Sequence, residues 1–188
     1  RLTAYLSFRN FGSQEDIRYQ EIRKKNEPNF KFKSLYIIFI FQAVLAMIIS
    51  MPLIAVAISS HSFGTLDIVG LGIIVFGILY ETVADYQLKQ FVKANQKGVL
   101  DKGLWRYSRH PNYFFEWLHW WAYIFLSFGS PLWWLSWLIM FVVLIFLVKI
   151  TGIPYTEQNA LRTKGDAYKE YQRTTSAFLL LPPKKSSL

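Results

Sequence analysis

Residues 35–59 read LYIIFIFQAVLAMIISMPLIAVAIS, a run of 25 residues without a charged side chain. A helix needs about 20 apolar residues to span the hydrocarbon core of a bilayer. Three further stretches, 66–84, 111–128 and 132–151, are nearly free of charge and of similar length. Four such stretches in 188 residues leave too little polar sequence to cover them in water. The sequence therefore predicts an all-α, polytopic integral membrane helical bundle.

Composition and charge exclude several other classes of protein. Of all residues 53% are hydrophobic, the formal net charge is +9, and there is no cysteine. A chain this apolar is not disordered, and without cysteine it is neither a disulfide-stapled secreted module nor a zinc-thiolate protein. A soluble nucleic-acid binder fits the net charge but not the four apolar stretches, so no nucleic-acid partner is expected. No metal site is expected either, because the three histidines are not clustered: His61, His110 and His119.

The polar parts of the sequence suggest how the chain is organised. Residues 1–33 form a polar, charged segment without a readable signal peptide, residues 34–178 form the transmembrane domain, and residues 179–188 form a tail. Because the chain begins at Arg1, we expect further residues and helices upstream in a longer protein. Residues 163–175 predict a short amphipathic cytoplasmic helix, in which three residues recur at helical spacing: Ala167, Tyr168 and Tyr171.

Lysine and arginine residues predict which side of the membrane each end faces. All 21 cations fall before the first apolar stretch, between the second and the third, or from Lys149 onward, in groups of eight, six and seven. The two short connections at 60–65 and 129–131 contain none. With four spans the three charged groups lie on one side, and the positive-inside rule makes that side cytoplasmic. Both termini and the middle loop are therefore expected in the cytoplasm.

Smaller features of the apolar stretches predict local structure. Pro52 indicates a kink in the first stretch. Three glycines of the second stretch suit close packing against another helix: Gly70, Gly72 and Gly77. An interfacial aromatic belt is expected at the start of the fourth stretch, from Trp133, Trp134 and Trp137.

Acidic residues within the apolar stretches are functional candidates, because a charge in the bilayer is costly. Glu116 is the only charged residue of the third stretch, and it follows Asn112 by four residues, so both lie on one helix face. The alternative for Glu116 is a structural pair with a nearby arginine. Glu81, Asp85 and Lys89 repeat the four-residue spacing at the inner end of the second stretch. Their alternative is a salt-bridge ladder at the membrane surface.

The middle loop contains the densest group of ligand-binding side chains, in the sequence GLWRYSRHPNY at 103–113. Pro111 suits the first turn of the third helix, and the free N–H groups and dipole of a helix start favour an anion. Arg106 and Arg109 add donors suited to phosphate. Four further residues supply donors: Ser108, His110, Asn112 and Tyr113. These residues predict a pocket at the cytoplasmic interface for a phosphorylated or carboxylated ligand with an aromatic ring; the alternative is contact with lipid phosphates.

The stretch GLWRYSRHPNYFFEW at 103–117 resembles the signature of the DUF1295 family, membrane proteins related to the steroid 5-alpha-reductase C-terminal domain. The resemblance covers most of the chain. It continues in four other motifs: DxRY at 16–19, ExxxDYQL at 81–88, GxPxxE at 152–157 and YxxYxRTTSAF at 168–178. The departure is Phe115, where relatives usually have glycine, and its larger side chain would narrow the space beside the pocket.

This resemblance implies a multi-spanning enzyme that uses NADPH to reduce a carbon–carbon double bond in a steroid-like or other lipid enone. Asn112 and Glu116 would lie near the nicotinamide amide, the arginines would take phosphate, and Tyr113 and Glu116 are the candidate catalytic residues for proton delivery. By position, the resemblance implies thirteen cofactor-binding residues: Asp85, Lys89, Arg106, Ser108, Arg109, His110, Asn112, Tyr113, Glu116, Glu157, Arg162, Tyr168 and Tyr171.

Two alternatives stay open from the sequence. Isoprenylcysteine carboxyl methyltransferases resemble the chain in Arg-His-Pro-x-Tyr and in C-terminal Glu and Tyr residues, but bind S-adenosylmethionine. Arg106 and Arg109 suit phosphates better than a sulfonium ion. The other alternative is a non-enzymatic lipid-binding membrane protein. The expected partners are the lipid bilayer and a hydrophobic lipid substrate; the sequence does not indicate an oligomeric state.

Overall fold

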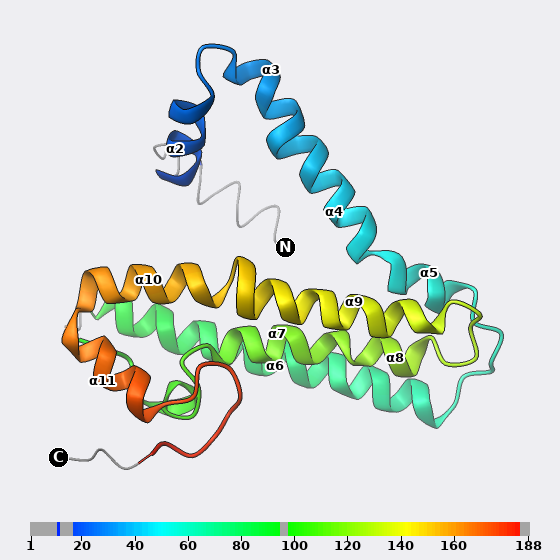
Figure 1. Ribbon diagram of the computed structural model, residues 1–188. Coiled ribbons are helices and arrows are strands. Elements are labelled where there is room, and N and C mark those ends of the chain that lie inside the picture. The colour runs from blue at the N-terminus through cyan, green and yellow to red at the C-terminus, as the bar shows by residue number, and fades with distance from the viewer. Residues whose placement is uncertain (1–10, 12–16, 95–97, 185–188) are drawn as a thin grey trace. The chain divides into compact units, whose positions relative to one another are not determined.

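The structure is a computed structural model that describes residue 11, residues 17–94 and residues 98–184, and all regular structure in those ranges is helical (Figure 1). Three helices are long and apolar enough to cross a membrane: Phe30–Ala57, Thr65–Lys93 and Trp133–Lys164. They contain the apolar stretches predicted at 35–59, 66–84 and 132–151, apart from the last residues of the first. The chain is therefore an all-α membrane protein, as the sequence predicts.

Residues 1–47 form one compact unit and residues 48–188 another. The described part of the first unit is a succession of helices: α2 (Ile17–Asn26), α3 (Phe30–Ser34), the π-helical η1 (Leu35–Ile40) and most of α4 (Phe41–Ile49). Few side chains of this unit are buried within the described residues, and many apolar ones are exposed, among them Phe39 and Phe41. Such a surface suits contact with lipid chains.

The second unit begins at the kink expected from Pro52. The helix is interrupted at Ser50, and α5 (Met51–Ala57) starts with Pro52 in its first turn. A proline is tolerated there because its missing N–H would have no partner within the helix. The break therefore has a local cause in the sequence.

In the second unit, α7 (Pro111–Trp120) and α8 (Ala122–Leu126) follow one another in line and pack against α6 (Thr65–Lys93) and α9 (Trp133–Ile145) (Figure 1). Helix α9 continues as the π-helical η3 (Phe146–Ile150). The core lies along α9 and η3, where Ile139, Val143 and Leu147 recur every fourth residue and are buried against three aromatic residues of α7: Tyr113, Trp117 and Trp120.

Two of the three glycines in α6 allow the close packing predicted from the sequence. A Cβ atom at Gly77 would lie 3.1 Å from the Phe115 carbonyl oxygen, and one at Gly70 would lie 3.1 Å from the Ala122 carbonyl oxygen. A Cβ atom at Gly72 would have no neighbour within 4 Å, so the expectation is wrong for that residue. Gly70 and Gly77 are two helical turns apart and therefore share the face that meets α7 and α8.

The third apolar stretch differs from the expected continuous span over 111–128. It forms α7 and α8, which are separated at Trp121. At 1.5 Å per residue, the 16 residues from Pro111 to Leu126 extend about 24 Å, less than the roughly 30 Å of a hydrocarbon core. The segment is therefore shorter than the three long apolar helices, and it lies against α6 and α9.

Of the three tryptophans at the start of α9, one is exposed and two are partly buried. Trp134 is exposed, as an interfacial residue would be. Trp133 donates from its indole nitrogen to the Ile124 carbonyl at 2.8 Å, and Trp137 packs edge-on against Trp121. Only Trp134 therefore presents its ring outward.

Beyond η3 the chain turns at Gly152 into α10 (Ile153–Lys164) and then into α11 (Asp166–Thr174). Gly165, with φ of 55°, separates these two helices. The helix expected over 163–175 therefore begins three residues later, because a positive φ ends α10 first. Tyr168 and Tyr171 are buried as predicted, whereas Ala167 is exposed.

Candidate functional site

The loop between α6 and α7 is folded back onto α6. It contains the short 3-10 helix η2 (Gly103–Arg106), whose buried Trp105 donates from its indole nitrogen to the Ala84 carbonyl at 3.0 Å. Gln87 accepts from the Leu104 amide at 3.1 Å. Its amide group lies against Gly103, where φ is 60° and a Cβ atom would come within 2.6 Å of Gln87 Oε1. The positive φ therefore favours glycine there, and a larger residue would also displace the Gln87 amide group.

Residues 175–184, termed here the C-terminal strap, lie along the same loop. The Arg109 amide donates to the Ser176 carbonyl at 2.8 Å, and the Ser108 hydroxyl donates to the Phe178 carbonyl at 2.9 Å. The Leu181 amide donates to the Tyr107 carbonyl at 3.0 Å. All three hydrogen bonds use main-chain groups of the strap. The loop and the strap together form one wall of the site.

Arg109 joins the loop to both C-terminal helices. Its Nε donates to Glu157 Oε1 at 2.6 Å, and one terminal nitrogen donates to the carbonyls of Gln172 at 3.0 Å and Thr175 at 2.6 Å. Only 9% of the Arg109 side chain is exposed. These donors are used within the protein, so Arg109 acts here as an internal clamp rather than as an open phosphate ligand.

Glu157 on α10 is the centre of this hydrogen-bond network. Besides Arg109, its carboxylate is contacted by His110 Nε2 at 3.2 Å, by the Tyr168 hydroxyl at 3.4 Å and by Gln172 Nε2 at 2.7 Å. Burial, and secondly the Glu157 charge, raise the pKa of Tyr168 above its ordinary value, so its phenol stays protonated and donates. The network fixes α7, α10 and α11 against one another.

Tyr171 anchors α11 to the loop. Its hydroxyl donates to the Trp105 carbonyl, and the Ser108 carbonyl lies 3.4 Å from the same oxygen. Burial raises the pKa of Tyr171, so this phenol also remains a donor. Its ring lines two cavities that lie on either side of it.

The smaller cavity has a volume of about 220 Å³. It lies between the start of α7 and the helices α10 and α11, and aromatic rings make up much of its wall. His110 and Tyr113 stack there with ring planes 7° apart and centroids separated by 5.5 Å. Other lining residues include Arg109, Asn112, Lys164, Tyr168 and Tyr171.

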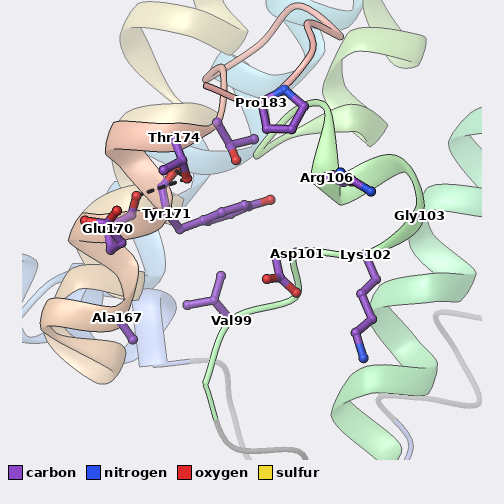
Figure 2. Close-up of a pocket in the computed structure, with 11 residues that line it drawn as sticks. Val99, Asp101, Lys102, Gly103, Arg106, Ala167, Glu170, Tyr171, Thr174 and Pro183 are labelled. Atoms are coloured by element: carbon purple, nitrogen blue, oxygen red, sulfur yellow. Dashed lines mark hydrogen bonds between the residues drawn. The ribbon is translucent and has the colours of Figure 1, made fainter. Parts of the chain in front are cut away.

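The larger cavity, of about 700 Å³, opens between the loop and α11 (Figure 2). Figure 2 shows the Tyr171 side chain extending from α11 toward the loop side, where Asp101, Lys102 and Arg106 lie. Glu170 of α11 also lines the cavity. Its charged residues have both signs, so it suits a ligand that combines phosphate groups with hydroxyl groups. Residues of the strap, such as Pro183, close one side.

Asn112 and Glu116 lie on one face of α7, but only Asn112 makes a hydrogen bond that reaches α6. Its side-chain nitrogen donates to Asp85 Oδ1 at 3.1 Å. The Asn112 side-chain oxygen is buried and has no hydrogen-bond partner among the described residues. Glu116 is half-buried and pairs with no described residue, so the arginine partner that would explain it structurally is not found in that part of the chain.

The structure places most of the residues predicted for the site around the two cavities. Arg109, His110, Asn112, Tyr113, Tyr168 and Tyr171 line the smaller one, and Arg106 lines the larger one with Tyr171. Glu157 and Ser108 hold the surrounding segments together. Asp85 contacts Asn112.

Three predicted residues lie apart from the cavities. One is Glu116, which lines neither of them. Arg162 donates to Asn159 on the exposed side of α10 and lines neither cavity. Lys89 is exposed, lines neither cavity and pairs with no residue in the described ranges, so the alternative of a salt-bridge ladder does not extend from Asp85 to Lys89. The resemblance alone placed Arg162 in the site, whereas Lys89 was also singled out by its spacing from Glu81 and Asp85.

Several residues of the site were not identified from the sequence, among them Asp101 and Glu170 of the larger cavity. Gln172 donates to Glu157, Lys102 lines the larger cavity, and Lys164 lines the smaller one, where its ammonium group lies 5.7 Å from the centre of the Phe91 ring. Gln172 could have been found, because it follows Tyr168 by four residues and therefore shares its helix face. Neither lysine had a comparable signal.

Comparison with known proteins gives one match. The family model described as "Protein of unknown function (DUF1295)" matches residues 1–175. No curated protein and no solved structure matches the chain.

Proposed function

The chain belongs to the DUF1295 family, and we propose that it is an integral membrane NADPH-dependent reductase, which reduces a carbon–carbon double bond in a steroid-like or other lipid enone. The observation that carries the proposal is the pair of cavities that meet at Tyr171. Ligand cavities are commonly about 300–1,000 Å³. An elongated cofactor with a charged part and a ring at one end matches a large charged cavity beside a small aromatic one.

The polar groups of the site fit such a cofactor. The buried Asn112 oxygen needs a donor, and a carboxamide NH₂ group supplies one. Lys102 and Arg106 in the larger cavity would hold phosphate groups by charge-assisted hydrogen bonds. Asp101, and Glu170 beside its ion pair with Arg173, would accept hydrogen bonds from ribose hydroxyl groups. When bound, the cofactor supplies a hydride.

The remaining task of the chain is to deliver a proton to the reduced substrate. Tyr113 lines the smaller cavity, and its ring is held by stacking on His110, which Glu157 orients. Glu116 lies one turn further along α7, on the same face as Asn112. We assign Tyr113 and Glu116 as the candidate proton donors. A lipid substrate reaches them from the bilayer, along the apolar surface of α6 and α7.

The distribution of cations supports an orientation for the proposed enzyme. All 21 lysine and arginine residues fall in three parts of the sequence: before the first apolar stretch, between the second and the third, and from Lys149 onward. By the positive-inside rule, these segments and the cofactor site face the cytoplasm, where NADPH is available. The lysine and arginine of the larger cavity belong to this set.

One observation favours a methyltransferase as a second candidate. Arg109 is bound to Glu157 and to two carbonyls, which removes one of the two arginines expected at phosphate. The smaller cavity is lined by the rings of Tyr113, Tyr168 and Tyr171, and aromatic faces attract a sulfonium ion. S-adenosylmethionine would then be the cofactor.

Calorimetric titration of the full chain in detergent micelles distinguishes these functions. NADPH and S-adenosylmethionine are titrated separately, and the proposal expects heat of binding with NADPH alone. Binding of S-adenosylmethionine in place of NADPH would overturn the reductase in favour of the methyltransferase. Binding of neither, with retention of anionic lipid, would favour the lipid-binding alternative.

A further inference from the structure

A second polar cluster lies at the opposite end of α6 from the candidate site. It is formed by Ser59 and His61 in the α5–α6 loop, Asp67 in the first turn of α6, and the main-chain carbonyl of Phe128 in the α8–α9 turn (Figure 1). Neither cavity of the candidate site includes any of these residues. The cluster therefore calls for an explanation separate from cofactor binding.

His61 is held at both ring nitrogens. Its Nδ1 lies 2.6 Å from the Ser59 hydroxyl oxygen, and its Nε2 lies 3.1 and 3.0 Å from the two carboxylate oxygens of Asp67. Asp67 also accepts from the Gly64 amide at 2.8 Å, which places its charge at the N-terminus of α6. The Ser59 hydroxyl donates to the Phe128 carbonyl at 2.8 Å. The α5–α6 loop, the start of α6 and, through Ser59, the α8–α9 turn are thus connected around one imidazole ring.

Counting hydrogens determines which form of His61 satisfies every contact. A carboxylate and a carbonyl are acceptors only, so Nε2 must carry a hydrogen for Asp67, and the hydroxyl hydrogen of Ser59 must point to Phe128. The Ser59 oxygen is then available only as an acceptor from Nδ1, which must also carry a hydrogen. The observed geometry is therefore complete only when His61 is the doubly protonated imidazolium.

When His61 loses one proton, Ser59 can donate a hydrogen bond to only one of its two neighbours. Neutral His61 keeps its hydrogen on Nε2 for Asp67, and Nδ1 becomes an acceptor. The single hydrogen of Ser59 then goes either to Nδ1 or to the Phe128 carbonyl, and the other group loses its donor. The link between the α5–α6 loop and the α8–α9 turn weakens, and the ion pair with Asp67 is lost as well.

We propose that Ser59, His61 and Asp67 form a proton-operated clamp, which ties the α5–α6 loop to the α8–α9 turn when His61 is protonated. Histidine is the side chain that ordinarily changes charge between pH 5 and 8. Asp67 is the charged group facing His61; the loop at 60–64 and the turn at 129–131 contain no lysine, arginine, aspartate or glutamate. In the orientation proposed above, the clamp faces the outside, so it responds to external acidification.

Thermal unfolding of the full chain in detergent at pH 5 and pH 8 tests the clamp. His61→Gln keeps a polar side chain but cannot take up the proton. The wild type should exceed H61Q in melting temperature by about 2–4 °C at pH 5, the size expected for one charge-assisted contact in a chain of this length, and by much less at pH 8. An equal difference at both pH values would overturn the proposal.

Two serine variants provide a matched comparison. Ser59→Ala should lower the melting temperature at pH 5, because the Phe128 carbonyl loses its donor. Ser60→Ala, at the exposed neighbouring position, should leave the pH dependence unchanged. Equal effects of the two variants would contradict the assignment of Ser59.

Hydrogen exchange of the wild type keeps the proposal testable if the variants fail to fold. The amides of Ser130 and Trp133 hydrogen-bond within the turn that the clamp holds. After correction for the intrinsic rate, they should exchange several-fold more slowly at pH 5 than at pH 8. Rates that do not depend on pH would overturn the clamp. None of these measurements involves a cofactor, so their outcome is separate from that of the proposed reductase.

Discussion

Arg109 and Glu157, 48 residues apart in the chain, are joined by a hydrogen bond of 2.6 Å between Nε and Oε1, and both side chains are largely buried. Arg109 lies two residues before the start of α7, and Glu157 lies on α10. Because three further groups contact the same carboxylate, this pair decides how the C-terminal helices sit against the loop. Breaking the pair of Arg109 and Glu157 by mutation is the most direct test of how the site is built.

Glu157→Gln should lower the free energy of unfolding by about 3–5 kcal/mol, because it leaves the Arg109 charge buried without a counter-charge. Denaturant titration of the detergent-solubilised protein measures this loss. Lys169→Ala is the matched control, since it breaks an exposed ion pair with Asp166 on α11 and should change stability little. Similar losses in the two variants would contradict a structural role for the buried pair.

Arg109→Lys should also destabilise the protein, even though it keeps the charge. A lysine ammonium group cannot reproduce the planar guanidinium that contacts Glu157 and two carbonyls at once. We expect a loss of about 2 kcal/mol or more, since buried carbonyls are left without donors. A denaturation midpoint equal to that of the wild type would show that a single charge is sufficient.

Arg106→Ala should weaken binding of NADPH by about tenfold, the effect of losing one charge-assisted hydrogen bond of roughly 1.4 kcal/mol. Its side chain is exposed and lines the larger cavity, so the fold should be unaffected. Calorimetric titration measures the change, with Lys169→Ala again as the control. Unchanged affinity in R106A would place the phosphates elsewhere.

Gly77→Ala should destabilise the packing of α6 on α7 by about 1–3 kcal/mol, the usual cost of overpacking. The added methyl group would lie 3.1 Å from both the Phe115 carbonyl oxygen and the His119 Cβ. Gly72→Ala meets open space on the same helix and should be neutral or stabilising, because alanine is the better helix former. Thermal unfolding of the two variants decides the matter, and the reverse order would show that α6 does not approach α7 at Gly77.

Tyr168 and Tyr171 should make the protein lose stability in alkaline solution. Burial raises both pKa values in the folded state, so the unfolded chain ionises first as the pH passes the ordinary tyrosine value of about 10. Stability contributed by the protonated phenols is therefore complete below that pH and is lost above it. Tyr168→Phe should reduce the slope of unfolding free energy against pH above 10, and a slope identical to that of the wild type would contradict this linkage.

The helices were predictable because their signal is local. A long apolar stretch is recognisable from its own residues, whether it is buried in lipid or in the bundle. Pro52 and Gly165 interrupt or end helices because of their own backbone preferences. The role of Arg109 was not predictable, since its partners lie 48 to 66 residues away. Without them, an arginine before a helix start looks like a phosphate ligand.

The glycines of α6 show the same limit. Gly70, Gly72 and Gly77 are alike in sequence, and only the position of α7 and α8 distinguishes the two that are packed from the one that is not. The resemblance named most of the residues around the cavities, but it could not tell the groups that line them from those, such as Ser108 and Glu157, that hold the walls together. That difference depends on tertiary contacts.

The strap's reliance on its own main chain has a practical consequence for handling the protein. The buried Phe178 is the exception, because its ring packs edge-on against Phe114 and Trp117 of α7. Substitutions at the other positions of residues 176–181 should leave the strap's course along the loop unchanged. Pro183 borders the larger cavity. Substitutions at that residue would therefore alter the opening through which a nucleotide is proposed to enter, and they are best avoided in variants made for binding assays.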